Sequence, residues 1–528
     1  MLRARPVVLR KIATILKFHD FVFSDADAHA RMPQIVALVI HVTDYEYDTD
    51  PEPAIQALLA ILKRTRCLVS LELSSSANGS PLGYLDDPRL SAAVGELFSL
   101  RELTIYGRTQ VADFISPVRS PLTKLALSCF NPLGALDEWT PSSPLTAALF
   151  RFAPSLETLT IQGSSILLPN GPPGSRLPAF THFHAVRSLT LNSLVALPYL
   201  PILLDLFPNL DGTMHLITRI QPSFHFASLS LAERYDLLRR AREENGVAQE
   251  RRRWKRLERL VCDVETLFVL NLRCPIGLTI VHGFPANADW VNRRCLVESL
   301  RDHPPTRLNL QAKGWCGSGD PELGGLIPPE AAATLTHLTL RASYLYFNGV
   351  DHPRVRWDDL WRDGLLPAIA ALHALTHFRL IFHLEAGEGA VPVSPIAEDA
   401  LVEDLRPTSR SRGRFNFAAA ASVMADALPS LRYCFMTNSA RVSKMEDFSI
   451  RLVEEWCESR AWRVGCVPLG SNDGDGGTTT VDTRGAGREL VELHDDVAET
   501  IIRREDLVLS TEEKASAVER RSFGGALR

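Results

Sequence analysis

The chain has 528 residues, which is too long for one compact core and indicates either several globular domains or one extended array of repeats. Hydrophobic residues make up 45% and charged residues 23%, as in ordinary folded proteins, and the formal net charge of −5 excludes an overall basic field that would attract nucleic acid or a membrane surface. The nine cysteines are scattered without a CxxC pair, so we expect no disulfide framework, no structural zinc site and a reducing compartment.

Residues 1–30 are expected to form a start segment or an N-terminal cap. Leu9, Ile12 and Leu16 share one face of a helix, and no acidic residue precedes Asp20. A mitochondrial targeting peptide is the alternative interpretation, although the stretch lacks serine and Pro6 interrupts the helix. No run of about 18 apolar residues occurs, so we expect no membrane-spanning helix.

A short phrase recurs from about residue 30 to residue 468: an apolar residue, two variable residues, an apolar residue, one variable residue and another apolar residue. Its last two apolar positions are two apart, as on one face of a strand, and the first position lies where a turn enters that strand. The phrase therefore predicts a short strand that is buried on one side. Its copies are Leu68-Leu71-Leu73, Leu100-Leu103-Ile105, Leu122-Leu125-Leu127, Leu156-Leu159-Ile161, Val186-Leu189-Leu191, Leu257-Leu260-Cys262, Leu335-Leu338-Leu340, Leu375-Phe378-Leu380 and Leu431-Cys434-Met436.

Helical patterns ending at a breaker precede many of these strands. The segment 145–152 ends at Pro154, and the segment 417–428 ends at Pro429, which stops the helix and lets the chain turn. Because one helix–turn–strand unit is too small to bury its own apolar face, several such units must stack. We therefore predict an α/β fold, an irregular leucine-rich-repeat solenoid with a curved parallel sheet and helices on its convex side. A conventional βαβ domain is the alternative.

The predicted organisation has four parts. Residues 1–30 form the start segment, and residues 31–468 form the degenerate solenoid, with insertions near 228–259, 314–329 and 385–414. Residues 469–487 are rich in Gly, Asp and Thr and are predicted to be a flexible linker. Residues 488–528 are predicted to be a charged, partly helical tail with Leu490, Leu493, Val497 and Ile501 on one face.

The repeat phrases resemble those of leucine-rich-repeat proteins, and their style is similar to the degenerate repeats of fungal F-box proteins. The resemblance is carried by "SLRELTIYG" (99–107), "SLETLTIQG" (155–163), "LTHLTLRA" (335–342) and "LPSLRYCFMTN" (428–438). It implies that the repeats bind a substrate protein while an F-box recruits the adaptor of a cullin-type ubiquitin ligase. No F-box is detected, because Met1–Phe23 contains neither the usual Leu-Pro opening nor a Glu- and Ile-rich helix.

The function predicted from this pattern is non-enzymatic binding of a protein partner on the concave face of the sheet. A curved solenoid offers a long, shallow surface that suits a protein or a peptide. A repeat scaffold without a ligase link is one alternative, and a globular α/β enzyme with an unrecognised site is another. The predicted partner-binding residues point outward from the strands: Glu72, Thr104, Thr160, Thr190, Thr339 and Arg379.

Other motifs favour structural interpretations, so we expect no catalytic residue, no cofactor and no metal ion. The basic run 251–259 is interleaved with glutamates and predicts a solvated helix, with a nuclear-localisation signal as the alternative. The WCGSG motif at 315–319 lacks a second cysteine, and the acidic segment 471–482 lacks the glutamate that closes an EF-hand loop. His182 and His184 have no further ligands nearby in the sequence. We expect a cytoplasmic or nuclear protein.

Overall fold

The computed structural model describes the residues that make up the larger part of the chain. They are 5–23, 31–42, 52–75, 85, 87–107, 111–128, 144–162, 182–194, 197–218, 229–285, 290–313, 325–347, 356–388, 400–406, 415–446, 449–466 and 488–507.

The chain forms two compact units. Unit 1 comprises Met1–Cys262 and Val269–Pro275, and unit 2 comprises Asp263–Phe268 and Ile276–Arg528. Helix α10 (Val264–Leu270) contributes residues to both units.

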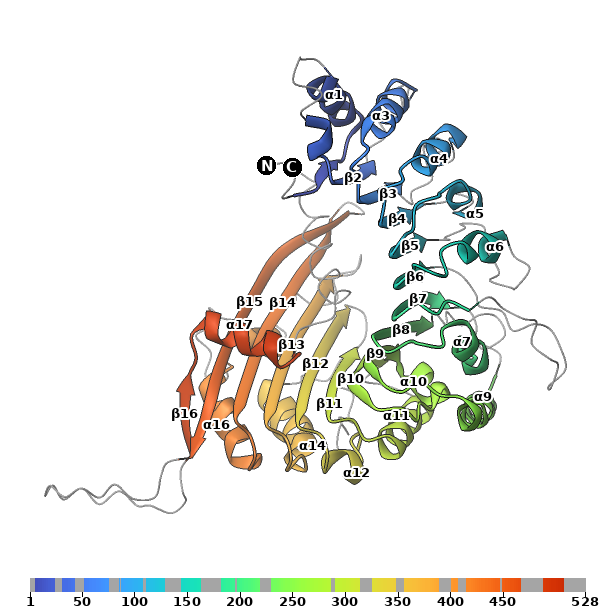
Figure 1. The fold of residues 1–528 in the computed structure, drawn as a ribbon. Coiled ribbons are helices and arrows are strands. Elements are labelled where there is room, and N and C mark those ends of the chain that lie inside the picture. The colour runs from blue at the N-terminus through green and yellow to red at the C-terminus, as the bar shows by residue number, and fades with distance from the viewer. Residues whose placement is uncertain are drawn as a thin grey trace, which may run out of the picture. The chain divides into compact units, whose positions relative to one another are not determined.

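The strands of unit 1 lie side by side in sequence order, and each pairs with the next in parallel. They are short, and Figure 1 shows them following an arc. They are β1 (Val7–Leu9), β2 (Ala37–Val42), β3 (Ser70–Ser75), β4 (Glu102–Tyr106), β5 (Lys124–Ser128), β6 (Thr158–Gln162), β7 (Ser188–Leu194), β8 (Thr213–Thr218) and β9 (Leu257–Asp263).

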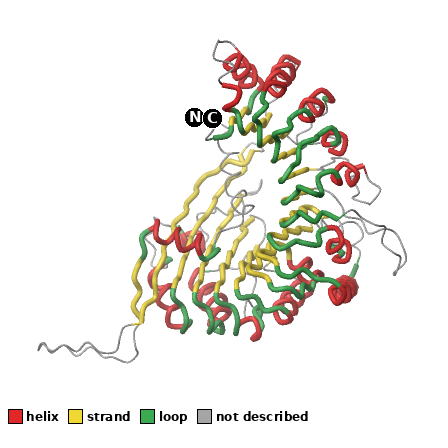
Figure 2. The backbone as a smooth tube through the Cα atoms, viewed as in Figure 1, coloured by secondary structure: helices red, strands yellow, loops and turns green. Residues whose placement is uncertain are grey.

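The helices of unit 1 lie on the outer side of this arc, as Figures 1 and 2 show. The opposite face of the strands carries no described helix. The helices are α1 (Ile12–Phe23), the short 3-10 helix η1 (Met32–Gln34), α3 (Glu52–Arg64), α4 (Pro88–Gly95), α5 (Val111–Ile115), α6 (Pro144–Phe150), α7 (Leu200–Leu206) and α9 (Leu231–Arg251).

The recurring apolar phrase accounts for the core between these helices and strands. In β4, Leu103 and Ile105 are fully buried, Thr104 between them is half-buried, and Leu100 is buried in the turn that enters the strand. The same alternation occurs in β6 around Leu159. Burial of each such leucine contributes roughly 1.5–3 kcal/mol to the free energy of folding. The core of unit 1 is therefore stabilised by many small and similar contributions.

Backbone hydrogen bonds join the turns at the strand entrances to one another. The amide N of Arg101 donates to the carbonyl O of Val69, that of Thr123 to Arg101, and that of Glu157 to Thr123, each at 2.8 Å. Arg187 and Gly212 continue the series at the same distance. The contact between successive helix–turn–strand repeats therefore begins before the strands, and main-chain atoms make it.

Unit 2 contains longer strands and changes direction near its end. Strands β10 to β14 pair in parallel and in sequence order, whereas β15 and β16 are antiparallel to their predecessors. The strands are β10 (Ile276–Pro285), β11 (Arg307–Lys313), β12 (His337–Phe347), β13 (His377–Glu388), β14 (Tyr433–Glu446), β15 (Ser449–Cys466) and β16 (Arg488–Glu492).

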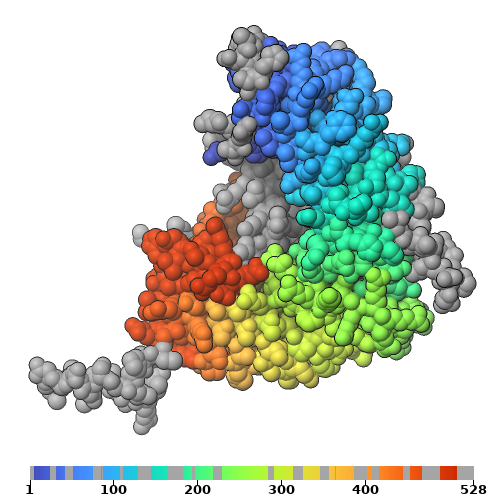
Figure 3. Space-filling view, in the orientation of Figure 1, coloured from blue at the N-terminus to red at the C-terminus, as the bar shows by residue number. Residues whose placement is uncertain are grey.

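All but one of the described helices of unit 2 lie on the same face of its sheet (Figure 1). They are α11 (Trp290–Asp302), α12 (Pro329–Ala332), α13 (Trp357–Asp359), the π-helix η3 (Leu360–Leu365), α14 (Leu366–Ala370), α15 (Ala400–Leu405) and α16 (Phe417–Ala427). The exception is α17 (Asp495–Arg504), which packs on the opposite face through Ala498, Ile501 and Ile502 against Phe435 of β14 and Ala461 of β15. In Figure 3 the red atoms of α17 lie over the orange strand region.

The architecture is thus an α/β fold with a mostly parallel, open sheet whose strands follow the order of the sequence. None of the described helices is both long and apolar enough to cross a membrane.

The stretch 228–259, predicted to be an insertion, contains a long helix. This stretch contains α9 and the start of β9, and α9 occupies the position of a repeat helix between β8 and β9. The helix buries Tyr235 and Leu238. Because it is 21 residues long and carries many charges, the repeat pattern is difficult to recognise in its sequence.

The described part of the tail is partly helical as predicted, and two of the four predicted apolar residues, Leu493 and Ile501, pack in the cluster around α17. The helix begins only at Asp495, so Leu490 belongs to β16 and Leu493 precedes the helix. Val497 is 45% exposed, while Ala498, Ile501 and Ile502 are buried. The predicted linker 469–487 lies outside the described residues, as do 314–324, 389–399 and 407–414 of the other two predicted insertions.

Candidate functional site

Four of the predicted partner-binding residues form a ladder on the helix-free face of unit 1. Strand register places Glu72 beside Thr104, Thr104 beside Ala126, Ala126 beside Thr160, and Thr160 beside Thr190. The four predicted side chains are half-buried, and they alternate with fully buried leucines. Their predicted strand phase therefore agrees with the structure.

The other two predicted residues lie on the equivalent face of unit 2, where neither of them is exposed to solvent as a free surface residue would be. Thr339 pairs with Arg379 and Arg379 with Phe435, so all three share one ladder. Thr339 is buried at 2% exposure, and the Arg379 guanidinium donates a 2.6 Å hydrogen bond to the carbonyl of Leu507, just beyond α17. An exposed binding role for Thr339 is therefore wrong, because strand phase alone does not reveal what covers the face.

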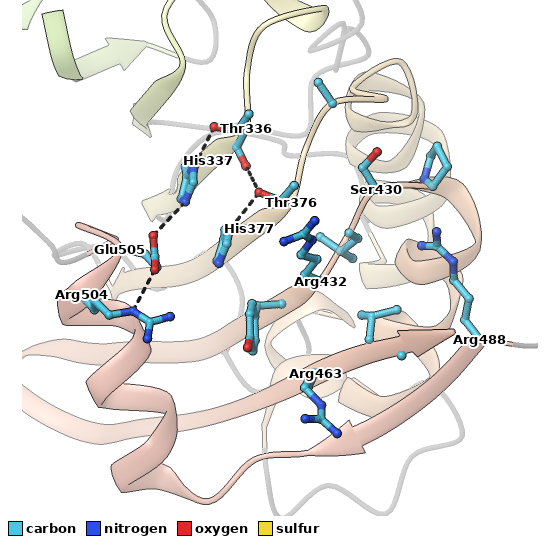
Figure 4. Close-up of a pocket in the computed structure, with 16 residues that line it drawn as sticks. Thr336, His337, Thr376, His377, Ser430, Arg432, Arg463, Arg488, Arg504 and Glu505 are labelled. Carbon is cyan, nitrogen blue, oxygen red and sulfur yellow. Dashed lines mark hydrogen bonds and ion pairs between the residues drawn. The ribbon is translucent and has the colours of Figure 1, made fainter. Parts of the chain in front are cut away.

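A cavity of about 930 Å³ opens in unit 2 where β12, β13 and β14 begin. Its volume is at the upper end of the range of small-molecule sites. Hydroxyl groups from Thr336, Thr376, Ser430 and Tyr433 line it, and Figure 4 shows several of them around a common space.

The charge of the cavity lining is strongly positive. Arg432, Arg463, Arg488 and Arg504 line the cavity, whereas Glu505 is the one carboxylate among the described residues that line it. Among the described residues, neither Arg432 nor Arg463 forms an ion pair. Arg488 donates to the carbonyls of Ala425 and Leu428 at the end of α16, and Arg504 donates to Glu505 at 3.0 Å. The lining is therefore suited to an anionic group.

Two histidines and Glu505 meet at one side of this cavity. His337 and His377 open adjacent strands in register, and their rings stack with centroids 4.3 Å apart and planes 6° from parallel. The Nε2 atom of His337 lies 3.3 Å from an Oε atom of Glu505. One ligand-type atom from each of the three residues lies within 4.8 Å of the other two, and no other such group occurs among the described residues.

Burial and neighbouring charge decide the protonation of this cluster. Burial lowers the pKa of His377 to about 4, with a further contribution from His337, and burial also lowers the pKa of His337. Burial raises the pKa of Glu505. The hydrogen bond from Arg504 and the two neighbouring histidines have a larger, opposite effect, so the pKa of Glu505 is lowered. The cluster therefore presents two neutral imidazoles and one carboxylate at neutral pH.

The other sequence motifs gather no comparable set of groups. His182 and His184 are exposed, with ring centroids 5.4 Å apart, and His182 pairs with the carbonyl of Asp205 at 2.6 Å. The basic run 251–259 is largely exposed, and Arg252 forms a 3.3 Å ion pair with Asp205. The segments 315–319 and 471–482 lie outside the described residues.

Sequence reasoning missed the histidine pair, although a signal was present. The dipeptide Thr-His follows the first leucine of two successive repeat phrases, at 336–337 and 376–377. Because equivalent positions of a parallel stack are neighbours, this repetition predicts stacked histidines. Glu505 carries no such signal, since it comes from the tail that folds back over the sheet.

Comparisons with protein-family models and with curated protein sequences found no match.

Proposed function

We propose that this chain is a non-enzymatic, leucine-rich-repeat-type recognition protein whose partner inserts an acidic segment into the arginine-lined cavity of unit 2. The observation that carries this proposal is the imbalance of charge in the cavity: four guanidinium groups face one carboxylate, and that carboxylate already has partners.

The arrangement of donors supports an acidic peptide segment as the ligand. Guanidinium groups bind carboxylates with two parallel hydrogen bonds, and Arg432 and Arg463 have no ion-pair partner of their own among the described residues. The surrounding hydroxyl groups of Ser430 and Tyr433 add donors for carboxylate or main-chain oxygens. Both arginines are exposed, so they attract a partner without a large desolvation cost.

A binding assay with charged peptides tests this proposal. A short fluorescent polyglutamate peptide should bind the full chain, with an affinity that falls as salt is added, and a polylysine peptide should not bind. The double variant Arg432→Gln/Arg463→Gln should bind polyglutamate about tenfold more weakly, which corresponds to about 1.4 kcal/mol. The matched control is Arg240→Gln/Arg251→Gln, which removes two exposed arginines of α9 and changes the net charge equally. Equal loss in both variants would contradict the assignment to the cavity.

A second proposal concerns the helix-free face of unit 1 and follows the resemblance to fungal F-box proteins. Glu72, Thr104, Thr160 and Thr190 lie on one ladder there, interrupted only by Ala126, and this mainly polar row suits a protein substrate of a cullin-type ubiquitin ligase. Association of the purified chain with a cullin-ligase adaptor tests the ligase role. A repeat scaffold without that link should show no association.

A further inference from the structure

The cluster of His337, His377 and Glu505 has a chemistry that recognition of an acidic segment does not use. Both histidines are 8% exposed, and Glu505 is half-buried. Figure 4 shows the two imidazoles side by side and Glu505 approaching them from the end of α17. Two strands of the sheet and a distant tail segment thus bring three metal-ligand groups to one point.

Threonine hydroxyls hold the two imidazoles in the same way. Thr336 Oγ1 lies 2.8 Å from Nδ1 of His337 and 3.0 Å from the carbonyl O of Thr306. Thr376 Oγ1 lies 2.9 Å from Nδ1 of His377 and 3.0 Å from the carbonyl O of Thr336. A hydroxyl has one hydrogen, and when it donates to the carbonyl its oxygen accepts Nδ1–H of the histidine. This tautomer leaves the Nε2 lone pairs available, as in histidines that bind metal ions.

We propose that His337, His377 and Glu505 bind a divalent transition-metal ion of the zinc type. The ligands would be the Nε2 atoms of the two histidines and one carboxylate oxygen, a donor set that zinc accepts with a fourth position open to water or substrate. Ligand atoms about 2.0–2.2 Å from a tetrahedral ion stand roughly 3.3–3.5 Å apart. The His337–Glu505 distance of 3.3 Å meets this requirement, and the widest separation, within 4.8 Å, needs a shift of about 1 Å.

Nearby arginines set the balance of charge at the site. Arg307 lies 3.6 Å from one Glu505 oxygen and Arg504 lies 3.0 Å from the other, so both keep the carboxylate ionised and both oppose a cation. Arg432 adds a more distant positive charge on the cavity wall. We therefore expect weaker binding than at a closed site with four protein ligands, with imidazole coordination supplying the selectivity for transition metals.

The ion would join the C-terminal segment to the sheet. Without it, α17 is held by a small apolar contact with Phe435 and Ala461 and by hydrogen bonds such as that from Arg379 to the Leu507 carbonyl. An ion that binds only the docked arrangement stabilises that arrangement in proportion to the logarithm of its concentration. The inference does not depend on the proposed function, because the metal site needs no acidic ligand.

Metal titration of the full chain, after removal of bound metal with a chelator, tests the site. We expect one equivalent of Zn²⁺ by calorimetry and a tetrahedral visible spectrum with Co²⁺. His337→Gln, His377→Gln and Glu505→Gln should each weaken binding at least about tenfold, and Thr376→Val should weaken it by roughly 10- to 100-fold through loss of the orienting hydrogen bond. Far-UV circular dichroism checks that each variant is folded.

The double variant His182→Gln/His184→Gln is the matched control, because it removes an exposed histidine pair of similar spacing. It should leave the affinity unchanged. Absence of Zn²⁺ binding by the unmodified chain overturns the proposal, as does binding that survives the three ligand substitutions. Hydrogen exchange gives a second measurement: Zn²⁺ should slow exchange of the α17 amides in the unmodified chain and in the control, and unchanged exchange would refute the link to the tail.

Discussion

At the scale of single residues, a few buried polar side chains join elements that are distant in the sequence. Asn245 of α9, at 1% exposure, is the clearest example. Its amide nitrogen donates to the carbonyls of Pro198 and Val269 at 3.1 and 2.9 Å, and its oxygen accepts from the amide N of Leu200 at 2.8 Å. One side chain therefore satisfies main-chain groups of the segments around α7 and α10.

Replacement of Asn245 by alanine should lower the free energy of unfolding by about 2–3 kcal/mol. The substitution leaves buried main-chain donors and acceptors unpaired, and each such group costs roughly 1–3 kcal/mol. Urea denaturation measures the change. Val247→Ala on the same helix is the control, because Val247 is 54% exposed and should change stability by less than about 0.5 kcal/mol. Similar values for the two variants would show that the Asn245 bonds do not matter.

At the scale of elements, ion pairs connect neighbouring helices of unit 1. Arg89 donates to Glu52 in the first turn of α3 at 2.8 Å and to Asp87, which caps α4. The hydrogen bond from Arg89 is the main reason that the pKa of Glu52 falls to about 2. A carboxyl group whose pKa is lower in the folded state stabilises the fold above its unfolded pKa, and this contribution is lost as the pH falls toward the folded value.

Arg89→Gln should therefore lower the melting temperature at about pH 6, and the difference from the unmodified chain should shrink between about pH 4.5 and pH 2. The effect should be small and should fall with added salt, because Glu52 and Arg89 are exposed. Melting curves at several pH values measure it. Arg66→Gln is a suitable control, since this exposed arginine forms no ion pair among the described residues. A difference that does not vary with pH would contradict the assignment to Glu52.

The elements of unit 1 were largely predictable, and those around the cavity were not. The spacing of Leu100, Leu103 and Ile105 predicts a turn and a strand, because the burial of these residues depends on local spacing alone. The helix α17 depends on tertiary packing: Ala498 and Ile502 become its buried face only because Phe435 and Ala461 lie beneath them. No local pattern marks Glu505 as the partner of His337, since 168 residues separate them.

At the scale of the whole molecule, strand order equals sequence order, so most contacts connect neighbours. The stability of such an array is approximately a sum of one term for each repeat and one term for each interface between neighbouring repeats. The linear order was predictable because every repeat phrase needs a neighbour to bury its leucines. The reversal at β14 and β15 was not, because both strands carry mixed polar sequences that specify no direction.

Leu159→Ala should show this linear arrangement directly. Leu159 in β6 is fully buried, and its truncation should cost about 2–5 kcal/mol through lost burial and a cavity. Hydrogen exchange should accelerate most in β5, β6 and β7 and much less in β2 and β3. Thr160→Ala, at the neighbouring half-buried position, is the control and should cost less than about 1 kcal/mol. Uniform acceleration across unit 1 would instead indicate a single cooperative core.

The hydrogen bonds at the strand entrances have a consequence for how such a sequence can change over time. Successive turns are joined through the amides and carbonyls of Arg101, Thr123, Glu157, Arg187 and Gly212, residues that differ in charge and in size. Since the main chain makes these contacts, they do not fix the side chains of Arg101, Thr123, Glu157 and Arg187. Gly212 is the exception, because a Cβ atom there would lie 2.8 Å from the carbonyl O of Arg187. The repeats can drift apart in composition while their mutual geometry persists, and a family of such proteins can diversify its surface until its members no longer resemble one another in sequence.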